Sequence, residues 1–322
     1  MKLKSILKKL NVISQCKHYK LPLWQCPQFF FLIMGIVTIV MILAGYGIFT
    51  KMIADPLIVA RIVVGLGLSL LIINFALTHG FRKAAEANQM KSEFIRIVSH
   101  QLRAPLSNCE WAVEFLISGR LGRIEEKQVK YLGILKENIY RMQELISKLL
   151  TASRIEAGTL PFEKVSFSLV DLIKDSILKF EPLAEASGIE ISFKPRPNLP
   201  KVIGDPSQIK VVVENLLDNA IHYTAPLSGL QKEKEEIKIR LKLKKNYLYF
   251  EIEDRGVGIP KLDQKYIFQK FFRGREVLKY RTQGSGLGLY ISKSIIEKSG
   301  GQIGFNSKPK KGSIFWFTLP IT

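Results

Sequence analysis

Cysteine and histidine are scarce in this chain, whose 322 residues include three cysteines and four histidines. The cysteines are Cys16, Cys26 and Cys109, and they lack the spacing of metal ligands. This argues against a cysteine-based metal centre, and a reducing compartment fits all three thiols. Acidic residues are also in deficit, with 28 Asp and Glu against 48 Lys and Arg, which gives a formal net charge of +20.

A charge of +20 invites a nucleic-acid interpretation, but the distribution of the charge argues against it. Basic residues are spread along the whole chain, and no nucleic-acid recognition motif accompanies them. Six lysines between Lys2 and Lys20 precede the first apolar run without an acid among them, and attraction to an anionic cytoplasmic leaflet explains them more simply. We therefore expect contact with membrane lipids and no nucleic-acid partner.

Two long apolar runs lie in the N-terminal third. Phe29 to Thr50 is uncharged, and Leu57 to Leu77 is interrupted only by Arg61 and Asn74. Each run has the roughly 20 residues that span a hydrocarbon core, whereas the apolar core of a secretory signal is shorter and nearer the start. We expect two membrane helices. In the second, Gly65 and Ser69 form a small-xxx-small pair that favours helix contact.

The flanks of the two runs predict their orientation. Lysines precede the first run, and His79, Arg82 and Lys83 follow the second, so both termini should be cytoplasmic and the protein should cross the cytoplasmic membrane twice. The turn from Lys51 to Pro56 leaves no room for an extracytoplasmic sensor domain. Any stimulus must then come from the bilayer, a membrane sensor partner or the cytoplasm.

A histidine lies in a helical pattern that follows the second run without a composition break. One face of this helix is apolar, and we expect it to be buried: Ile95, Val98, Leu102, Leu106, Cys109, Val113 and Leu116. His100 points away from that face, which taken alone fits an ordinary surface histidine. Pro105, five residues later, removes a backbone donor and should bend the helix.

A second helical pattern completes a hairpin. The segment from Ser118 to Arg123 contains two glycines and predicts a turn, after which apolar residues from Leu132 to Leu149 repeat at steps of three and four. Gly158 should end this helix as a C-terminal cap. Two antiparallel helices with apolar stripes cannot bury both faces alone, so we expect two hairpins to pair into a four-helix bundle in a homodimer.

From about Leu160 the pattern becomes mixed and predicts an α+β layer structure of helices over a mixed sheet. Strand-like runs occur at 190–193, 237–243, 247–253, 301–306 and 313–319, and helical runs at 169–187, 206–223 and 287–299. Residues 226–236 are polar and charged, which predicts a loop. The expected divisions are a basic segment at 1–28, a membrane hairpin at 29–78, the histidine helices at 79–158 and a catalytic domain at 159–322.

Four blocks in this last part suggest nucleotide chemistry, although each alone is ambiguous. Asn215 and Asn219 share one helix face, where two amide oxygens can hold a magnesium ion. Asp254-Arg-Gly256-Val-Gly258-Ile259 follows a strand, and its glycines permit close backbone approach to a ligand. An aromatic cluster from Ile267 to Phe272 precedes Arg273. Gly284-Ser-Gly286-Leu287-Gly288 opens a helix, whose N-terminal N–H groups bind phosphate.

Taken together, these blocks carry a family resemblance. His100-Gln-Leu-Arg-Ala-Pro-Leu106 resembles the phosphoacceptor box of the sensor histidine kinases, whose usual pattern is His-Glu-Leu-Arg-Thr-Pro-Leu. The four later blocks, in this order and spacing, resemble the ATP-binding domain shared by gyrase, Hsp90, histidine kinases and MutL. The resemblance covers about Ser92 to Leu319. Two positions depart from the phosphoacceptor pattern: Gln101 replaces the acid, and Ala104 replaces Thr or Asn.

The resemblance implies a role for each matched residue. Asn219 would be the main Mg²⁺ ligand with Asn215 assisting, and Asp254 would accept a hydrogen bond from the adenine amino group. His222 stands where the family has Lys, which puts that phosphate contact in doubt. The resemblance also implies that Tyr223 lies beside the base and that Arg273 faces the phosphates. The pocket and its lid would be formed by Gly256, Gly258, Ile259, Gly284, Gly286, Leu287 and Gly288.

The implied activity is that of an ATP-dependent protein-histidine kinase with ATP and Mg²⁺ as cofactors. His100 would receive the γ-phosphoryl group, assisted by Gln101, and pass it to an aspartate of a separate response regulator, since no receiver-like domain follows Thr322. Ala104 predicts weak phosphatase activity. Two alternatives remain: an ATP-binding, membrane-anchored pseudokinase that acts as a scaffold, which Gln101 favours, and an ATPase of the gyrase or Hsp90 kind.

Overall fold

The computed structural model describes residues 27–53, 55–224, 235–274 and 284–321. The chain divides into two compact units, one made of residues 1–105 and 156–160, the other of residues 106–155 and 161–322.

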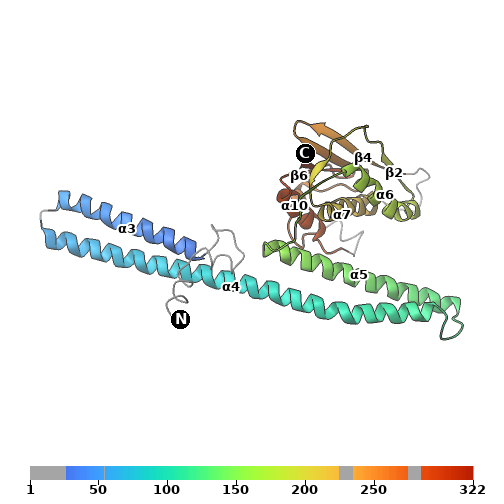
Figure 1. Ribbon diagram of the computed structural model, residues 1–322, viewed down its shortest axis with the longest axis horizontal. Coiled ribbons are helices and arrows are strands. Elements are labelled where there is room, and N and C mark those ends of the chain that lie inside the picture. The colour runs from blue at the N-terminus through green and yellow to red at the C-terminus, as the bar shows by residue number, and fades with distance from the viewer. Residues whose placement is uncertain (1–26, 54, 225–234, 275–283, 322) are drawn as a thin grey trace. The chain divides into compact units, whose positions relative to one another are not determined.

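Two long apolar helices lie near the N-terminus: α3 (Pro27–Met52) and α4 (Pro56–Ile117) (Figure 1). The segments Phe31–Met52 and Pro56–Phe81 have 22 and 26 residues and are apolar enough to cross a membrane. At about 1.5 Å of rise per residue, each exceeds the roughly 30 Å of a hydrocarbon core. Only 6% and 11% of their most apolar windows are buried, so these are not core helices of a soluble domain.

The predicted short connection between the two apolar runs is confirmed. Only Ile53 to Asp55 separate α3 from α4, and the Asp55 carboxylate accepts a 2.8 Å hydrogen bond from the Leu57 N–H at the start of α4. Helix α3 packs along one side of α4, the side on which Val59, Gly67 and Asn74 are buried. Gly67 lies against α3, since a Cβ added there would lie 3.2 Å from Ile42 Cδ1.

Helix α4 continues from its apolar segment through Pro105 to Ile117 without interruption, as the absence of a composition break predicts. A turn with Gly119 and Gly122 at positive φ leads into α5 (Glu126–Glu156), which ends beside Gly158, also at positive φ. Lys136 Nζ lies 2.7 Å from Glu114 Oε1 across the hairpin. The predicted helical hairpin is therefore present.

The burial predicted for the apolar stripe of α4 is wrong at several positions. Val113 is buried, but Cys109 is exposed, and Leu102 and Leu116 are 45% and 40% exposed. The physical reason is that a two-helix hairpin covers only one side of each helix.

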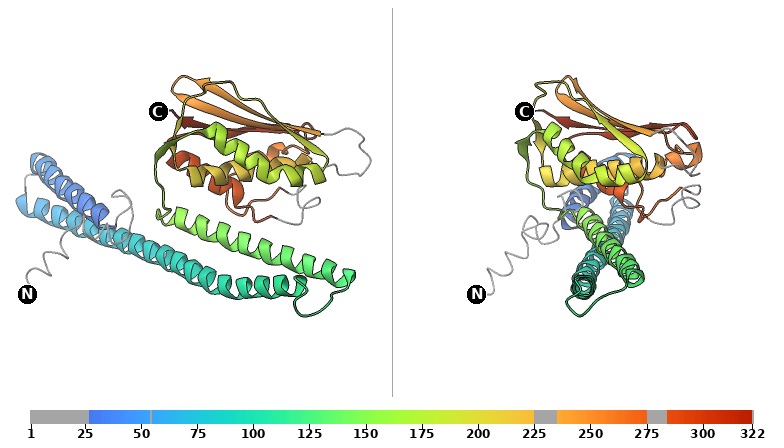
Figure 2. Two further views of the ribbon diagram at one scale, coloured as in Figure 1. Left: turned by 45° about the vertical axis from the view of Figure 1, so that its right-hand side comes forward. Right: turned by 90° about the vertical axis from the view of Figure 1, so that its right-hand side faces the viewer.

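The C-terminal part contains the predicted α/β structure with a mixed sheet (Figure 2). Five strands pair in the order β2-β4-β5-β7-β6, with β2 parallel to β4 and the other neighbours antiparallel. Their bounds are β2 Ile189–Phe193, β4 Glu235–Lys244, β5 Tyr247–Asp254, β6 Ile303–Ser307 and β7 Ser313–Pro320. Helices α6 (Leu169–Ala186), α7 (Pro206–Thr224) and α10 (Gly288–Lys298) cover one face.

The core lies between that sheet face and the three helices. Alternate residues of β7 are buried, as a strand with one covered face requires, and Phe317 stacks on Phe250 of β5 with ring centroids 4.5 Å apart. Ile209, Leu216 and Ile221 of α7 fill the helix side. Helix α7 packs against both α10 and β5, and α10 also contacts β6 and β7.

Three short elements were not apparent in the sequence. β1 (Val165–Phe167) and β3 (Val202–Gly204) form a separate antiparallel pair, and α8 (Lys261–Gln264) follows the glycine turn after β5. Elements of three or four residues are too short to establish a period. The loop predicted at 226–236 extends too far, since Glu235 and Glu236 belong to β4, and residues 225–234 lie outside the described part of the chain.

Candidate functional site

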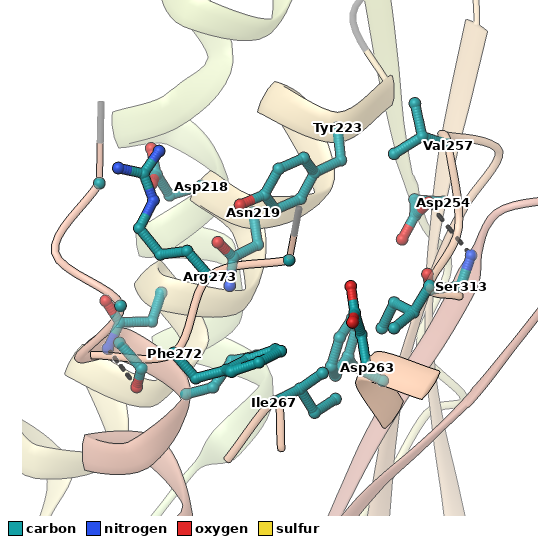
Figure 3. A pocket seen from close by; sticks show the side chains of 18 of the residues that line it. Asp218, Asn219, Tyr223, Asp254, Val257, Asp263, Ile267, Phe272, Arg273 and Ser313 are labelled. Atoms are coloured by element: carbon teal, nitrogen blue, oxygen red, sulfur yellow. Dashed lines mark hydrogen bonds between the residues drawn. The ribbon is translucent and has the colours of Figure 1, made fainter. Parts of the chain in front are cut away.

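A cavity lies where α7, the turn after β5 and the start of α10 meet (Figure 3). Helix α7 contributes polar side chains, the turn after β5 and the segment before α10 contribute backbone and glycines, and apolar side chains close one end. Its lining from this domain is Asn215, Asp218, Asn219, Tyr223, Asp254, Val257, Gly258, Ile259, Pro260, Asp263, Ile267, Phe272, Arg273, Gly274, Gly284, Ser285, Gly286, Gly288, Leu289, Ser313 and Phe315.

Asp254 ends β5 at the deep side of this cavity and is 6% exposed. Its Oδ1 accepts hydrogen bonds from the backbone N–H of Gly256 at 2.9 Å and of Ser313 at 3.1 Å. Burial raises the pKa of the carboxyl from its ordinary 3.8 to about 6, although both N–H donors act in the opposite direction. The group is therefore an ionised hydrogen-bond acceptor at neutral pH that is held in an apolar setting.

The two glycines after Asp254 are required by close backbone contacts. A Cβ added to Gly256 would lie 2.1 Å from the Tyr223 carbonyl oxygen, and one added to Gly258 would lie 2.1 Å from the Lys308 carbonyl oxygen. Gly258 also has a positive φ of 67°. Gly258 and Ile259 line the cavity, whereas Gly256 packs the turn onto α7 outside it.

The two asparagines of α7 face the cavity from one side of the helix, as their spacing predicts, but their surroundings differ. The Asn215 amide nitrogen lies 3.4 Å from the Gly288 carbonyl oxygen and 3.5 Å from Ser292 Oγ, so this side chain is engaged by α10. Asn219 points into the cavity (Figure 3). Of the two amide oxygens, that of Asn219 is better placed to reach a cation held by a ligand.

His222 does not line the cavity. Its Nδ1 lies 2.8 Å from the Asp218 carbonyl oxygen and 3.0 Å from Asp218 Oδ1, one helical turn earlier. This contact holds the imidazole back along α7. Asp218 itself lines the cavity and lies beside Arg273 in Figure 3, so the acid rather than the histidine faces the interior.

The glycine-rich segment before α10 approaches the cavity with its backbone. Gly284 and Gly286 have positive φ values of 130° and 67°, and a Cβ added to Gly286 would lie 2.7 Å from the Phe271 carbonyl carbon. α10 then begins at Gly288, where the first N–H groups of a helix have no partner within the helix. Leu287 is a core residue, 1% exposed, and does not line the cavity.

His100 and Gln101 belong to the other compact unit. Both are exposed on α4, and the neighbouring Ser99 is buried. The imidazole is therefore open to solvent and to an approaching ligand. Among the described residues, no group of three or more His, Cys, Asp or Glu side chains could hold a metal ion.

Four polar lining residues of this domain were missed from the sequence: Asp218, Asp263, Ser285 and Ser313. Asp263 of α8 points its carboxylate into the cavity (Figure 3), and Ser313 begins β7 beside Asp254. Ser313 is near Asp254 only because β5 and β7 are antiparallel neighbours in the sheet. Asp263 could have been noticed because it lies three residues after Pro260 of the glycine turn. However, nothing in the local sequence distinguishes it from an ordinary surface acid.

Comparison with known proteins agrees with this arrangement. Residues 90–158 match the family model described as the His Kinase A (phospho-acceptor) domain. Residues 204–322 match the one described as histidine kinase-, DNA gyrase B- and HSP90-like ATPase. The cavity lies almost wholly within this second segment.

Among curated relatives, the chain is 33% identical over 253 residues to the sensor histidine kinase GacS of Pseudomonas protegens, covering 77% of this chain and 26% of GacS. It is 30% identical over 249 residues to the signal transduction histidine-protein kinase BarA of Escherichia coli, covering 74% of this chain and 26% of BarA. The chain thus spans about a quarter of the length of these relatives.

Among solved structures, the crystal structure of full-length ShkA in complex with AMPPNP matches with a TM-score of 0.58. The identity is 21%, and the match covers 71% of this chain and 46% of that one. At this level of identity the likeness concerns the fold.

Proposed function

The chain belongs to the sensor histidine kinases, and on this basis we propose that it transfers the γ-phosphoryl group of Mg-ATP to His100 and then to an aspartate of a separate response regulator. The observation that carries the proposal is the cavity, because it joins a buried carboxylate, two asparagine amides and glycine backbone in a segment matched to this ATPase family. The exposed histidine on α4, in the matched phosphoacceptor segment, supplies the nucleophile.

Each part of the nucleotide has a counterpart in the cavity. The Asp254 carboxylate accepts a hydrogen bond from the adenine amino group, and Tyr223 and Ile259 border the base. Arg273 and the backbone N–H groups at the start of α10 bind the phosphates. Asn219, with Asn215 as the weaker ligand, would hold Mg²⁺, and the bound ion would neutralise phosphate charge.

The chemical step uses the exposed imidazole of His100. A lone pair on a ring nitrogen attacks the γ-phosphorus, an N–P bond forms, and the bond to the oxygen that bridges the β- and γ-phosphorus atoms breaks to release ADP. The amide oxygen of Gln101 accepts a hydrogen bond from the other ring N–H and orients the ring. In the second reaction the N–P bond breaks as an aspartate oxygen of the regulator takes the phosphoryl group.

The proposal includes a homodimer that crosses the membrane twice with both termini in the cytoplasm. Support for the dimer is the exposed apolar surface of the hairpin, which includes Leu102, Trp111 and Leu116 of α4 and Leu135 of α5. Water-exposed apolar side chains of this size favour a partner. Support for the topology is the basic charge that flanks the two apolar helices.

Incubation of the full chain in detergent with Mg-ATP labelled at the γ-phosphorus tests the proposal. We expect label on the protein that is lost in acid and kept in alkali, because the N–P bond of phosphohistidine is acid-labile. Hydrolysis of ATP without labelled protein would favour the ATPase alternative. Binding of ATP with neither outcome would favour the scaffold alternative.

Gln101→Glu should increase the rate of autophosphorylation. A carboxylate at this position stabilises the positive charge that develops on the imidazole, and charge-assisted hydrogen bonds are roughly twice as strong as neutral ones. The initial rate of labelling at saturating Mg-ATP measures the effect. Gln128→Glu, a change of the same kind in the α5 part of the hairpin, is the control. An equal or slower rate in Gln101→Glu would show that Gln101 does not limit the wild-type reaction.

Ala104→Thr should increase dephosphorylation of the response regulator. In the family, Thr or Asn at this position orients the attacking water, and loss of one such positioning group commonly lowers a rate on the order of 10²-fold. The decay of phosphorylated regulator mixed with the protein and ADP measures this activity. Fast decay with wild-type protein, unchanged in His100→Ala, would contradict the expectation, since that variant excludes transfer back to the histidine.

Affinity for the adenine base should fall as the pH drops through about 6, where Asp254 becomes protonated and is a weaker acceptor. The stability of the fold should respond in the opposite direction. Because the pKa of this acid is raised, its favourable contribution is complete below 3.8 and is lost as the pH rises through about 6. Adenosine binding measured on both sides of pH 6 is the test, because adenosine has no phosphate that titrates. Constant affinity would show that Asp254 does not contact the base.

A further inference from the structure

One row of residues crosses three strands at the end of the sheet that borders the cavity. Ser313 of β7 pairs with Asp254 of β5 on one side and with Ser307 of β6 on the other. Asp254 and Ser313 are both 6% exposed and line the cavity (Figure 3). Ser307 is half-buried and lies outside the lining. Any effect of Ser307 on a bound ligand must therefore pass through the residues that it contacts.

The Ser307 hydroxyl makes three hydrogen-bond contacts with described residues. Its Oγ lies 2.8 Å from the Ile259 backbone nitrogen, 3.1 Å from the Gly312 carbonyl oxygen and 2.9 Å from Ser313 Oγ. A hydroxyl has one proton to donate and two lone pairs that accept. The Ile259 N–H can only donate, and the Gly312 carbonyl can only accept. The Ser307 hydroxyl therefore accepts from Ile259 and donates to Gly312.

The direction of the contact between the two serines follows from these roles. Because the single proton of Ser307 points at Gly312, the Ser307 oxygen can only accept from Ser313. The reverse direction would leave the Ser307 oxygen and the Gly312 carbonyl oxygen 3.1 Å apart with no proton between them, which is unfavourable. One arrangement of protons satisfies all three contacts, and in it the Ser313 hydroxyl donates to Ser307.

This arrangement decides what Ser313 presents to the cavity. With its proton directed at Ser307, the Ser313 hydroxyl has only lone pairs left for a ligand. The neighbouring Asp254 carboxylate is ionised at neutral pH and can likewise only accept. These two side chains thus offer a ligand hydrogen-bond acceptors and no donor.

The groups around the Ser307 hydroxyl are held by the backbone. A Cβ added to Gly312 would lie 1.9 Å from the Asp254 carbonyl oxygen, so the chain that carries the accepting carbonyl is packed closely against the end of β5. Gln264 Nε2 donates to the Ile259 carbonyl at 3.0 Å and to the Ser307 carbonyl at 3.2 Å. The Ser307 proton is therefore directed at a backbone acceptor whose position does not depend on a side-chain rotamer.

We propose that Ser307 is a positioning residue for selection of the base, because it holds the Ser313 hydroxyl as an acceptor toward the cavity. The inference rests on the proposed function, from which it takes the purine nucleotide. Adenine carries an amino group at position 6, which is a donor that matches these acceptors. A 6-oxo purine such as hypoxanthine carries an oxygen there, and acceptors facing that oxygen disfavour its binding. Ser307 thus favours ATP over inosine triphosphate.

Binding titrations of the full chain in detergent with Mg-ATP and with Mg-inosine triphosphate test this proposal. The two nucleotides have the same ribose and phosphates, so the ratio of their affinities reports on the base. We expect the wild type to prefer ATP. Ser307→Ala should lower the ratio on the order of tenfold, because the Ser313 proton is then free to donate to the oxygen of the 6-oxo base. Ser307→Thr keeps the hydroxyl and should keep the ratio. An unchanged ratio in Ser307→Ala, or the same fall in Ser307→Thr, would overturn the proposal.

Gln264→Ala is the matched control for loosening of the structure. This change removes the other side-chain contact between Ile259 and β6 but leaves the Ser307 hydroxyl in place. We expect weaker binding of both nucleotides with an unchanged ratio of affinities. An equal fall of the ratio in Gln264→Ala and Ser307→Ala would overturn the proposal, because packing near Ile259 would then select the base.

A double-mutant cycle tests the path through Ser313. In a Ser313→Ala background there is no hydroxyl proton for Ser307 to hold, so adding Ser307→Ala should leave the ratio of affinities unchanged. The interaction between the two changes isolates this contact from the effect of either change alone. A fall of the ratio as large as in the wild-type background would overturn the proposal.

The same titrations separate this inference from the proposed function. A preference for ATP that persists undiminished in Ser307→Ala would overturn the role of Ser307 and leave the proposed ATP site intact. A wild type that binds neither nucleotide would remove the ATP site itself, and with it this inference.

Discussion

Replacement of His100 by alanine should abolish incorporation of the γ-phosphoryl group of ATP into this protein. The reaction needs a nitrogen lone pair to form the N–P bond, and alanine has none, so we expect a loss on the order of 10³-fold or more. ATP binding should be unchanged, because His100 lies in a different compact unit from the cavity. Incubation with ATP labelled at the γ-phosphorus measures phosphoryl incorporation, and a separate titration measures ATP binding.

His79→Ala is the matched control for this variant. His79 is also an exposed histidine of α4, stacked on Phe75 with ring centroids 6.0 Å apart, and should retain full labelling. Label that persists in His100→Ala, or that is lost equally in both variants, would contradict the assignment of His100 as the phosphoacceptor.

Replacement of Asn219 by alanine should eliminate Mg-ATP binding and, with it, autophosphorylation. Asn219 points into the cavity from α7 and has the amide oxygen best placed to complete the coordination of a phosphate-bound cation. A buried Mg²⁺ that loses its protein ligand leaves phosphate charge uncompensated, and we expect affinity to fall on the order of 10²-fold or more. Binding titrations with Mg²⁺ and with a chelator separate the metal-dependent part.

Asn306→Ala provides the control, since Asn306 is exposed on β6 and does not line the cavity. Asn215→Ala should have a mixed effect, because its amide also contacts Gly288 and Ser292 of α10. If Asn219→Ala binds Mg-ATP as tightly as the wild type, the nucleotide pocket is assigned to the wrong side of α7.

Several features of the candidate site were predictable because they depend on local sequence. The spacing of Asn215 and Asn219 places both on one side of α7, and the glycines after Asp254 predict a tight turn. The cavity accordingly contains most of the predicted residues. His222, Gly256 and Leu287 are the exceptions, because their orientation depends on contacts with Asp218, with Tyr223 and with the domain core.

Exposure was the property least accessible to prediction. Cys109 lies in the apolar stripe of α4, yet it is exposed, because α5 covers only one side of that helix. Asp263 reaches the cavity from α8, and Ser313 reaches it from β7, whose pairing with β5 brings together residues about 60 apart in the chain. Periodicity identifies which residues share a face, but not which neighbour covers that face.

The sequence by itself determined the two apolar helices, the uninterrupted helix that carries His100, and the order of the longer strands and helices in the catalytic part. These features depend on side chains a few residues apart, through hydrophobic period, chain length and turn residues. Only the tertiary structure decided which lining residues meet in the cavity, that burial raises the pKa of Asp254, and that one face of α4 is uncovered. Those properties depend on contacts between distant segments, which no local pattern specifies.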